Sequence, residues 1–178
     1  MSDPLTRAAL DTERHVARRG WDQPVRLFAL VETAELLARE PALAAQLATE
    51  EQAPGELTAV EQEGMPPTAD LASMLARVAW PETVVGAAIA VERIVVPPEA
   101  ERDLPADPRA AVDALAAHPD RKDVRLLVAV LRGPEGRAGE GPAVCLLRQR
   151  DHDRDDRVAT GADLAPGLVA ALRATLEG

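Results

Sequence analysis

The chain has 178 residues and a formal net charge of −10, with 47% hydrophobic but only 2% aromatic side chains. This length suits one domain with a substantial core. An acidic surface repels phosphate backbones and anionic lipids. With so few aromatic residues, the chain also lacks the side chains on which the bases of single-stranded nucleic acid stack. We therefore expect neither a nucleic-acid nor a membrane partner.

The residue types that supply most nucleophiles and general bases are rare. The chain has one Cys, three His, two Ser, one Lys and no Tyr. We therefore predict no catalytic residue and favour a protein that is not an enzyme. We also expect no cofactor, because the sequence has neither a Walker lysine in a Gly-rich loop nor the dinucleotide-binding glycine spacing.

The N-terminal residues predict a helix over 4–19. Apolar residues recur at three- and four-residue spacing, Asp3 can cap the first turn ahead of Pro4, and Gly20 follows the end. Residues 25–31 fit either a helical stripe or a buried strand, and we choose the strand.

A helix is expected from Thr33, which can cap it. Pro41 either breaks this helix or begins a second short one through Leu47.

Residues 40–76 contain seven acidic and no basic side chains. We expect an acidic, mobile loop at about 49–67, with a short strand near Leu57–Val60. Because long loops are often functional, this one could serve as a docking surface for a basic partner. The alternative is that its acidic side chains only keep the protein soluble. The docking carboxylates would be Glu50, Glu51, Glu56, Glu61 and Glu63.

The middle of the chain predicts a helix from Thr68 or Asp70 to about Ala79, and then the clearest strand, 83–96. Both alternating sets of that strand are apolar, which indicates a strand covered on both faces. A short helix then begins at Asp107-Pro108 and ends before Pro119, with Val112 and Leu115 expected to point inward.

The last third predicts strands 123–132 and 142–149 joined by a flexible Gly-rich connector. A charged turn follows, and Asp163 is expected to cap the final helix. The buried stripe of that helix would be Leu164, Leu168, Val169, Leu172 and Leu176.

This order of elements predicts a single α+β domain over 1–178, with a central, mostly antiparallel sheet of four or five strands packed with helices. Helices would cover the sheet on both sides, or a second copy of the chain would cover one of them.

Arginines flank the predicted strand ends. If these ends meet, they form a cationic rim suited to an anion or a carboxylate-bearing peptide. The alternative is ordinary ion pairing at sheet ends, which is common and weak. The ligand-binding candidates are Arg93, Arg125, Arg148 and Arg150.

Alternating carboxylates at Asp151, Asp153 and Asp155 resemble the first half of a calcium-binding loop, and they are the metal-ligand candidates. The template then requires Gly at its sixth position and Glu at its twelfth, where this chain has Asp156 and Ala162. The alternative interpretation is a solvated turn.

Five stretches of the chain together resemble an uncharacterised family of small acidic proteins from high-GC actinobacteria. The most specific is WPETVVGAAIAVERIVVPPEA (80–100), and the others are HVARRGWDQPVRLFALVETAELL, LTAVEQEGMP, VRLLVAVLRG and GADLAPGLVAALRATL. The resemblance implies a cytoplasmic bacterial protein. The family has no assigned activity, so the resemblance implies no catalytic or binding residue.

The sequence favours a non-enzymatic adaptor or chaperone-like module that binds another protein and forms a homodimer. A small-anion or metal-dependent binding protein or enzyme, using the sheet-end arginines and the Asp151–Asp156 turn, is the alternative. One cysteine permits no intramolecular disulfide, and MSDPLTRAALDTERH lacks the apolar core of a signal peptide. We therefore expect a cytoplasmic protein.

Overall fold

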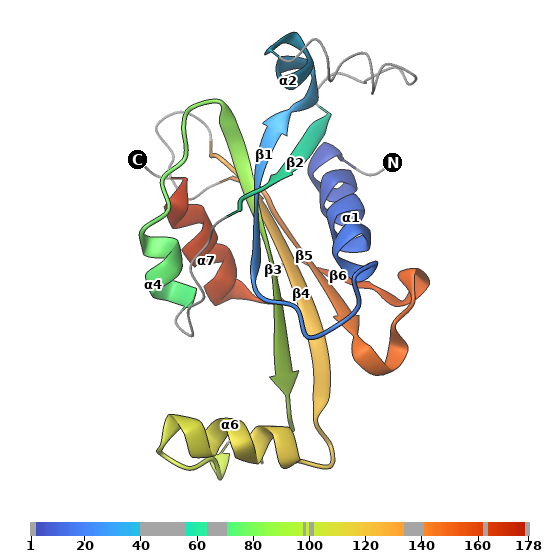
Figure 1. Cartoon of the computed structure of the whole chain (residues 1–178), viewed down its shortest axis with the longest axis vertical. Coiled ribbons are helices and arrows are strands. Elements are labelled where there is room, and N and C mark those ends of the chain that lie inside the picture. Colours follow the sequence, from blue (N-terminus) through green and yellow to red (C-terminus); the bar gives the residue numbers. More distant parts are fainter. Residues whose placement is uncertain are drawn as a thin grey trace.

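The computed structural model describes residues 3–39, 56–63, 71–97, 99, 102–133, 141–161 and 164–176. They form one α+β domain, with a six-stranded antiparallel sheet and five α-helices within these ranges (Figure 1). The predicted fold class is confirmed, and the sheet has one strand more than expected.

The strands stand in the order β2-β1-β3-β4-β5-β6. Every neighbouring pair is antiparallel. The strands are β1 (Arg26–Glu32), β2 (Leu57–Glu61), β3 (Val84–Val95), β4 (Lys122–Leu131), β5 (Ala143–Gln149) and β6 (Ala159–Gly161). The α-helices are α1 (Pro4–Ala17), α2 (Thr33–Arg39), α4 (Leu71–Ala76), α6 (Pro108–Ala117) and α7 (Pro166–Thr175).

Helix α1 begins at Pro4 as predicted and ends at Ala17, two residues before the predicted end. The Asp3 carboxylate accepts a hydrogen bond from the Thr6 amide at 2.9 Å, which satisfies a free donor of the first turn. Gly20 has a φ of +80°, a left-handed conformation that glycine adopts without a Cβ clash. The expected stripe is buried, and Glu13 is buried beside it.

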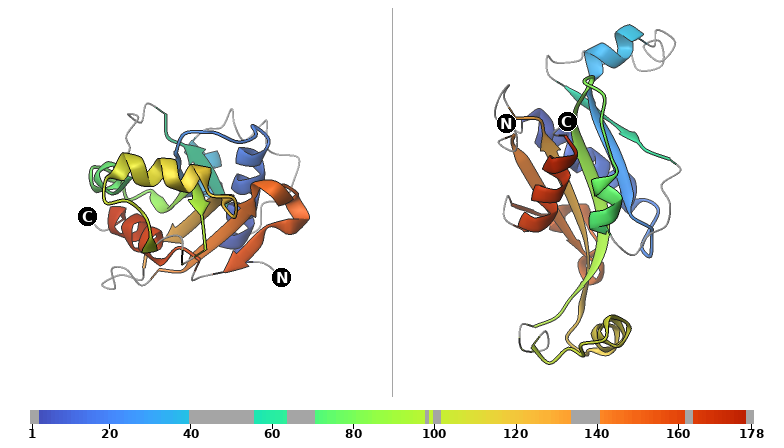
Figure 2. Two further views of the ribbon diagram at one scale, coloured as in Figure 1. Left: turned by 90° about the horizontal axis from the view of Figure 1, so that it is seen from below. Right: turned by 90° about the vertical axis from the view of Figure 1, so that its left-hand side faces the viewer.

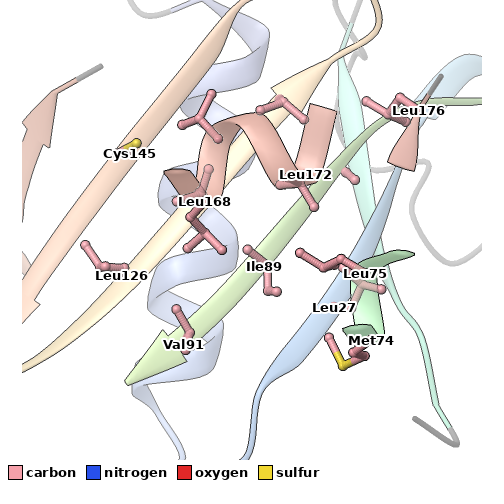
Figure 3. Packing of buried hydrophobic residues seen from close by; sticks show 14 of the residues in the cluster. Leu27, Met74, Leu75, Ile89, Val91, Leu126, Cys145, Leu168, Leu172 and Leu176 are labelled. Carbon is pink, nitrogen blue, oxygen red and sulfur yellow. The ribbon is translucent and has the colours of Figure 1, made fainter. Parts of the chain in front are cut away.

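Helices of the chain itself cover both faces of the sheet (Figure 2). On one face, α4 and α7 pack against strand residues that include Leu27, Ile89 and Leu126 (Figure 3). On the other face, α1 packs against Phe28 and Leu127 among others. The apolar strands therefore need no second copy of the chain to bury them.

The expectation that α6 turns its apolar residues inward is wrong. Helix α6 buries no residue, and Val112 is 58% exposed. The physical reason lies in β3, whose continuous burial ends at Val91 while the strand runs on to Val95. Figures 1 and 2 show α6 beyond the ends of β3 and β4, apart from the helices that cover the sheet.

The C-terminal region also departs from expectation. Helix α7 begins at Pro166, later than predicted, with Ala165 at its N-cap and no side-chain cap, and Leu164 is 42% exposed rather than buried. The remaining four residues of the predicted stripe are buried. Strand β6, which extends the sheet at the β5 edge, was not predicted.

The short strand expected near Leu57–Val60 is confirmed as β2. The rest of the predicted acidic loop, the possible helix through Leu47, and the cap residues Thr68, Asp70 and Asp163 lie outside the described residues. No helix in the described ranges is long and apolar enough to cross a membrane.

Gly86 provides a direct test of the strand packing. A Cβ at this position would lie 2.3 Å from the Val130 carbonyl oxygen, which is backbone and cannot rotate away. We predict that Gly86→Ala destabilises the protein by about 2–3 kcal/mol in chemical denaturation. The control is Gly167→Ala, which meets no atom within 4 Å and should leave stability unchanged or raise it by about 0.5 kcal/mol. Equal effects of the two substitutions would contradict the described register.

Candidate functional site

The sheet register places three charged residues side by side on the face that α1 covers. Glu92 pairs with Arg125, and Arg125 pairs with Arg148, across β3, β4 and β5. Each lies two residues along its strand from a buried apolar residue of that face, namely Ala90, Leu127 and Leu146. The predicted meeting of sheet-end arginines therefore takes place for Arg125 and Arg148.

Arg148 lies under α1 and binds Glu13. Its Nε and Nη2 atoms donate to the two Glu13 carboxylate oxygens at 2.8 and 2.6 Å, and both side chains are at most 3% exposed. The Glu13 hydrogen bonds are the main cause that raises the pKa of the Arg148 guanidinium. Glu13 follows Ala9 by four residues and precedes Val16 by three, so a carboxylate on the buried stripe was the sequence signal for this pair.

Two of the predicted metal ligands bind Arg148 instead. Asp153 and Asp155 accept hydrogen bonds from its guanidinium at 2.9 and 2.7 Å, and Asp151 accepts one from Lys122 at 3.1 Å. Arg148 is the main cause that lowers the pKa of Asp155. Within the described ranges, no three His, Cys, Asp or Glu side chains are grouped so as to hold a metal ion.

Arg125 is buried behind an aromatic residue that the sequence analysis did not single out. Its guanidinium lies 4.4 Å from the centre of the Trp21 ring, and it donates to the Gly20 carbonyl and to Glu92. Its Nε and Nη1 atoms are buried and have no hydrogen-bond partner in the described structure. Trp21 follows Gly20, so the turn that ends α1 places the ring over Arg125.

A groove of about 510 Å³, lined in part by Trp21, opens between the α1–β1 turn and α6. We call it the arm groove, because α6 and the outer ends of β3 and β4 form an arm (residues 92–97 and 102–124). It contains two of the four predicted ligand-binding arginines, Arg93 and Arg150. Its lining residues are Trp21, Asp22, Glu92, Arg93, Ile94, Val112, Leu115, Arg121, Asp123, Val124 and Arg150.

The charged groups of the arm groove are unevenly paired. Arg150 donates to both oxygens of Asp22 at 3.0 and 3.1 Å, and lies 3.7 Å from Asp123. Arg121 donates to a backbone carbonyl of α6 and lies 3.8 Å from Asp123. Arg93 is exposed and has no ion-pair partner among the described residues. The predicted rim is thus divided into two covered and two accessible arginines.

Of the predicted docking carboxylates, Glu56 and Glu61 are engaged within the chain. Glu56 pairs with Arg7 of α1, and Glu61 accepts two hydrogen bonds from Arg26 of β1. Glu63 is exposed, and Glu50 and Glu51 lie outside the described residues. The docking role of this segment stays a prediction.

A second hollow, of about 400 Å³, lies between α1 and β2 and is lined in part by Asp11, His15 and Glu61. The Nε2 atom of His15 lies 3.5 Å from the guanidinium of Arg26, which itself binds Glu61. The group beside this ring is therefore a cation already used in an ion pair.

The buried pair gives a prediction about stability. Replacing Arg148 with Met would leave the Glu13 carboxylate buried without a cation, so Arg148→Met should reduce the unfolding free energy by about 3–5 kcal/mol. Arg154→Met is the control, because its partner Asp156 is 63% exposed, and it should change stability by less than about 1 kcal/mol. Urea denaturation of both variants measures the two changes in unfolding free energy. Similarly small decreases would show that the buried pair contributes no more to stability than an exposed pair.

A second prediction concerns pH. Arg26 hydrogen bonds lower the pKa of Glu61 from its usual 4.5. The folded pKa is therefore below the unfolded one, so the stabilisation is present above about pH 4.5 and is lost as pH falls through the folded pKa. Glu61→Gln should reduce stability at about pH 7 and have a smaller effect at about pH 3. The unfolding free energy at both pH values tests this, and an effect independent of pH would contradict it.

Comparison with known proteins places this chain in a family but gives no activity. No curated protein and no solved structure matches it. One family model, described as PPA1309-like protein, matches residues 5–177 and thus nearly the whole chain. The family is uncharacterised, so it transfers no ligand and no site residue. The chain therefore belongs to the PPA1309-like protein family.

Proposed function

We propose that this protein is a non-enzymatic protein-binding module, an adaptor whose arm groove receives a segment of a different protein through apolar side chains. One observation carries the proposal. Helix α6 is held at the outer end of β3 and β4 with no residue buried, although it carries Val112 and Leu115. Apolar side chains left at the rim of a groove are typical of an interaction surface.

The walls of the groove suit a peptide segment. Ile94, Val112 and Leu115 give an apolar surface, and Trp21 adds an aromatic ring held in place by Arg125. The volume of about 510 Å³ accommodates a few side chains rather than a folded domain. Aromatic and arginine side chains around an apolar centre are the composition found at binding hot spots.

We favour a different protein over a second copy as the occupant. The strands are apolar on both faces, which favoured a homodimer, but helices of the same chain cover both faces. Two copies would also bring together two molecules of net charge −10. A homodimer stays a prediction, which gel filtration with light scattering can test.

Small-anion or metal-dependent chemistry is the second candidate and has less support. Arg148 lies under α1 and is saturated by three carboxylates, and Arg125 lies behind Trp21. The adaptor proposal includes a cytoplasmic setting, which suits a chain whose single cysteine, Cys145, is buried in β5.

Val112→Asp tests the adaptor proposal. Short random peptides displayed on phage are selected on the wild-type protein, and the enriched peptides are measured on the variant. We expect peptides whose affinity falls at least tenfold, by about 1.4 kcal/mol or more, because a carboxylate then interrupts the apolar wall. Val112 is 58% exposed, so the fold should be retained.

The matched control is Val60→Asp, since Val60 is also exposed, at 39%, but lies on β2 outside the arm groove. The enriched peptides should bind this variant as they bind wild type. Failure to enrich any peptide, or peptides that bind Val112→Asp unchanged, would contradict the proposal.

A further inference from the structure

We infer that the segment received by the arm groove carries a carboxylate beside its apolar side chains, and that Arg93 binds this carboxylate. The inference builds on the proposed function and adds the chemical class of the partner. It rests on a comparison of the groove carboxylates, which already bind groups of this chain, with the groove arginines, of which Arg93 has no ion-pair partner among the described residues.

The three carboxylates that line the groove are already engaged by this chain. Asp22 accepts two hydrogen bonds from Arg150. Glu92 accepts from the backbone amides of Asp22 and Gln23 at 2.8 and 3.0 Å, and also from Arg125. Asp123 lies within 4 Å of both Arg121 and Arg150, and its Oδ1 atom is buried without a hydrogen-bond partner among the described residues. A basic segment would have to share these carboxylates with the groups that already bind them, and only Asp22, which is 76% exposed, is readily reached from solvent.

The arginines of the groove still have guanidinium donors that can bind a ligand carboxylate. Arg93 lines the groove, is exposed and makes no ion pair with any residue that the structure describes. The side chain of Arg121 is 41% exposed; it donates to a neutral carbonyl and lies 3.8 Å from Asp123. A guanidinium binds a carboxylate with two parallel hydrogen bonds, which is the strongest pairing that this lining can offer to a ligand.

Buried Arg125 contributes a further positive charge next to the groove. Its side chain is 1% exposed, it stacks on the Trp21 ring that forms one wall, and two of its nitrogen atoms have no hydrogen-bond partner in the described residues. Together with the lining it brings four arginines against three carboxylates. The lining itself is balanced, with three arginines and three carboxylates, and Arg125 behind Trp21 raises the formal charge of this group of side chains to +1.

The acidic surface elsewhere does not cancel this preference. At physiological ionic strength charges are screened over about 8 Å, so distant carboxylates act weakly on a ligand inside the groove. A ligand carboxylate next to Arg93 experiences mainly the guanidinium it touches. Ile94, Val112 and Leu115 would contact the apolar side chains of the same segment.

The test uses the peptides enriched on wild-type protein, labelled with fluorescein and measured by fluorescence polarisation. We expect them to share Asp or Glu close to an apolar residue. Arg93→Glu should weaken their binding by about tenfold or more, and replacing the peptide carboxylate with Lys should restore binding to this variant. Arg109→Glu is the matched control, since Arg109 is exposed on α6 but does not line the groove, and it should leave affinity unchanged.

The outcomes separate this inference from the function on which it builds. Peptides that depend on Val112 but lack an acidic residue, or that bind Arg93→Glu as tightly as wild type, would overturn the role of Arg93 and leave the adaptor function standing. Peptides that do not depend on Val112 would overturn the adaptor function itself.

Discussion

The architecture depends on one mismatch of length: the two central strands, β3 and β4, run beyond the helices that cover the sheet. Burial is nearly continuous along β3 as far as Val91, and then alternates with exposure to its end. Beneath the helices, apolar side chains are removed from water on both faces, which supplies most of the stability. Beyond them, the same hydrogen-bonded ladder supports α6 at a distance from the core and leaves its apolar residues accessible.

The same mismatch determines which of the sheet-end arginines are buried and which are accessible. Arg148 is covered by α1, where burial requires a partner of opposite charge, and Glu13 and two aspartates provide it. Arg125 lies behind Trp21 and is only partly satisfied. Arg93 and Arg150 lie outside the cover and line the arm groove. Of the four candidate arginines, two therefore belong to a buried ion-pair network or its border, and the other two belong to an accessible surface.

The sequence predicts the elements well where periodicity is strong, as in α1 and β3. It fails for β6, because three residues, Ala159–Gly161, contain no periodic pattern. For α6, the pattern identifies an apolar face but cannot tell whether anything packs against it, so Val112 was expected inside. Two of the four candidate arginines do line the groove, whereas Trp21 reaches it through the turn after Gly20. Such packing between segments far apart in the chain has no local sequence signal.

The most direct measurement of the central claim is a map of backbone amide shifts on the ¹⁵N-labelled protein, recorded by NMR as a selected peptide is added. The account predicts that the largest shifts fall on Trp21, Asp22, Arg93, Ile94 and α6, with little change along β2 and β6. Shifts concentrated at the α1–β2 hollow or along the β2 edge would contradict it, because the ligand would then bind where Glu56 and Glu61 are engaged within the chain.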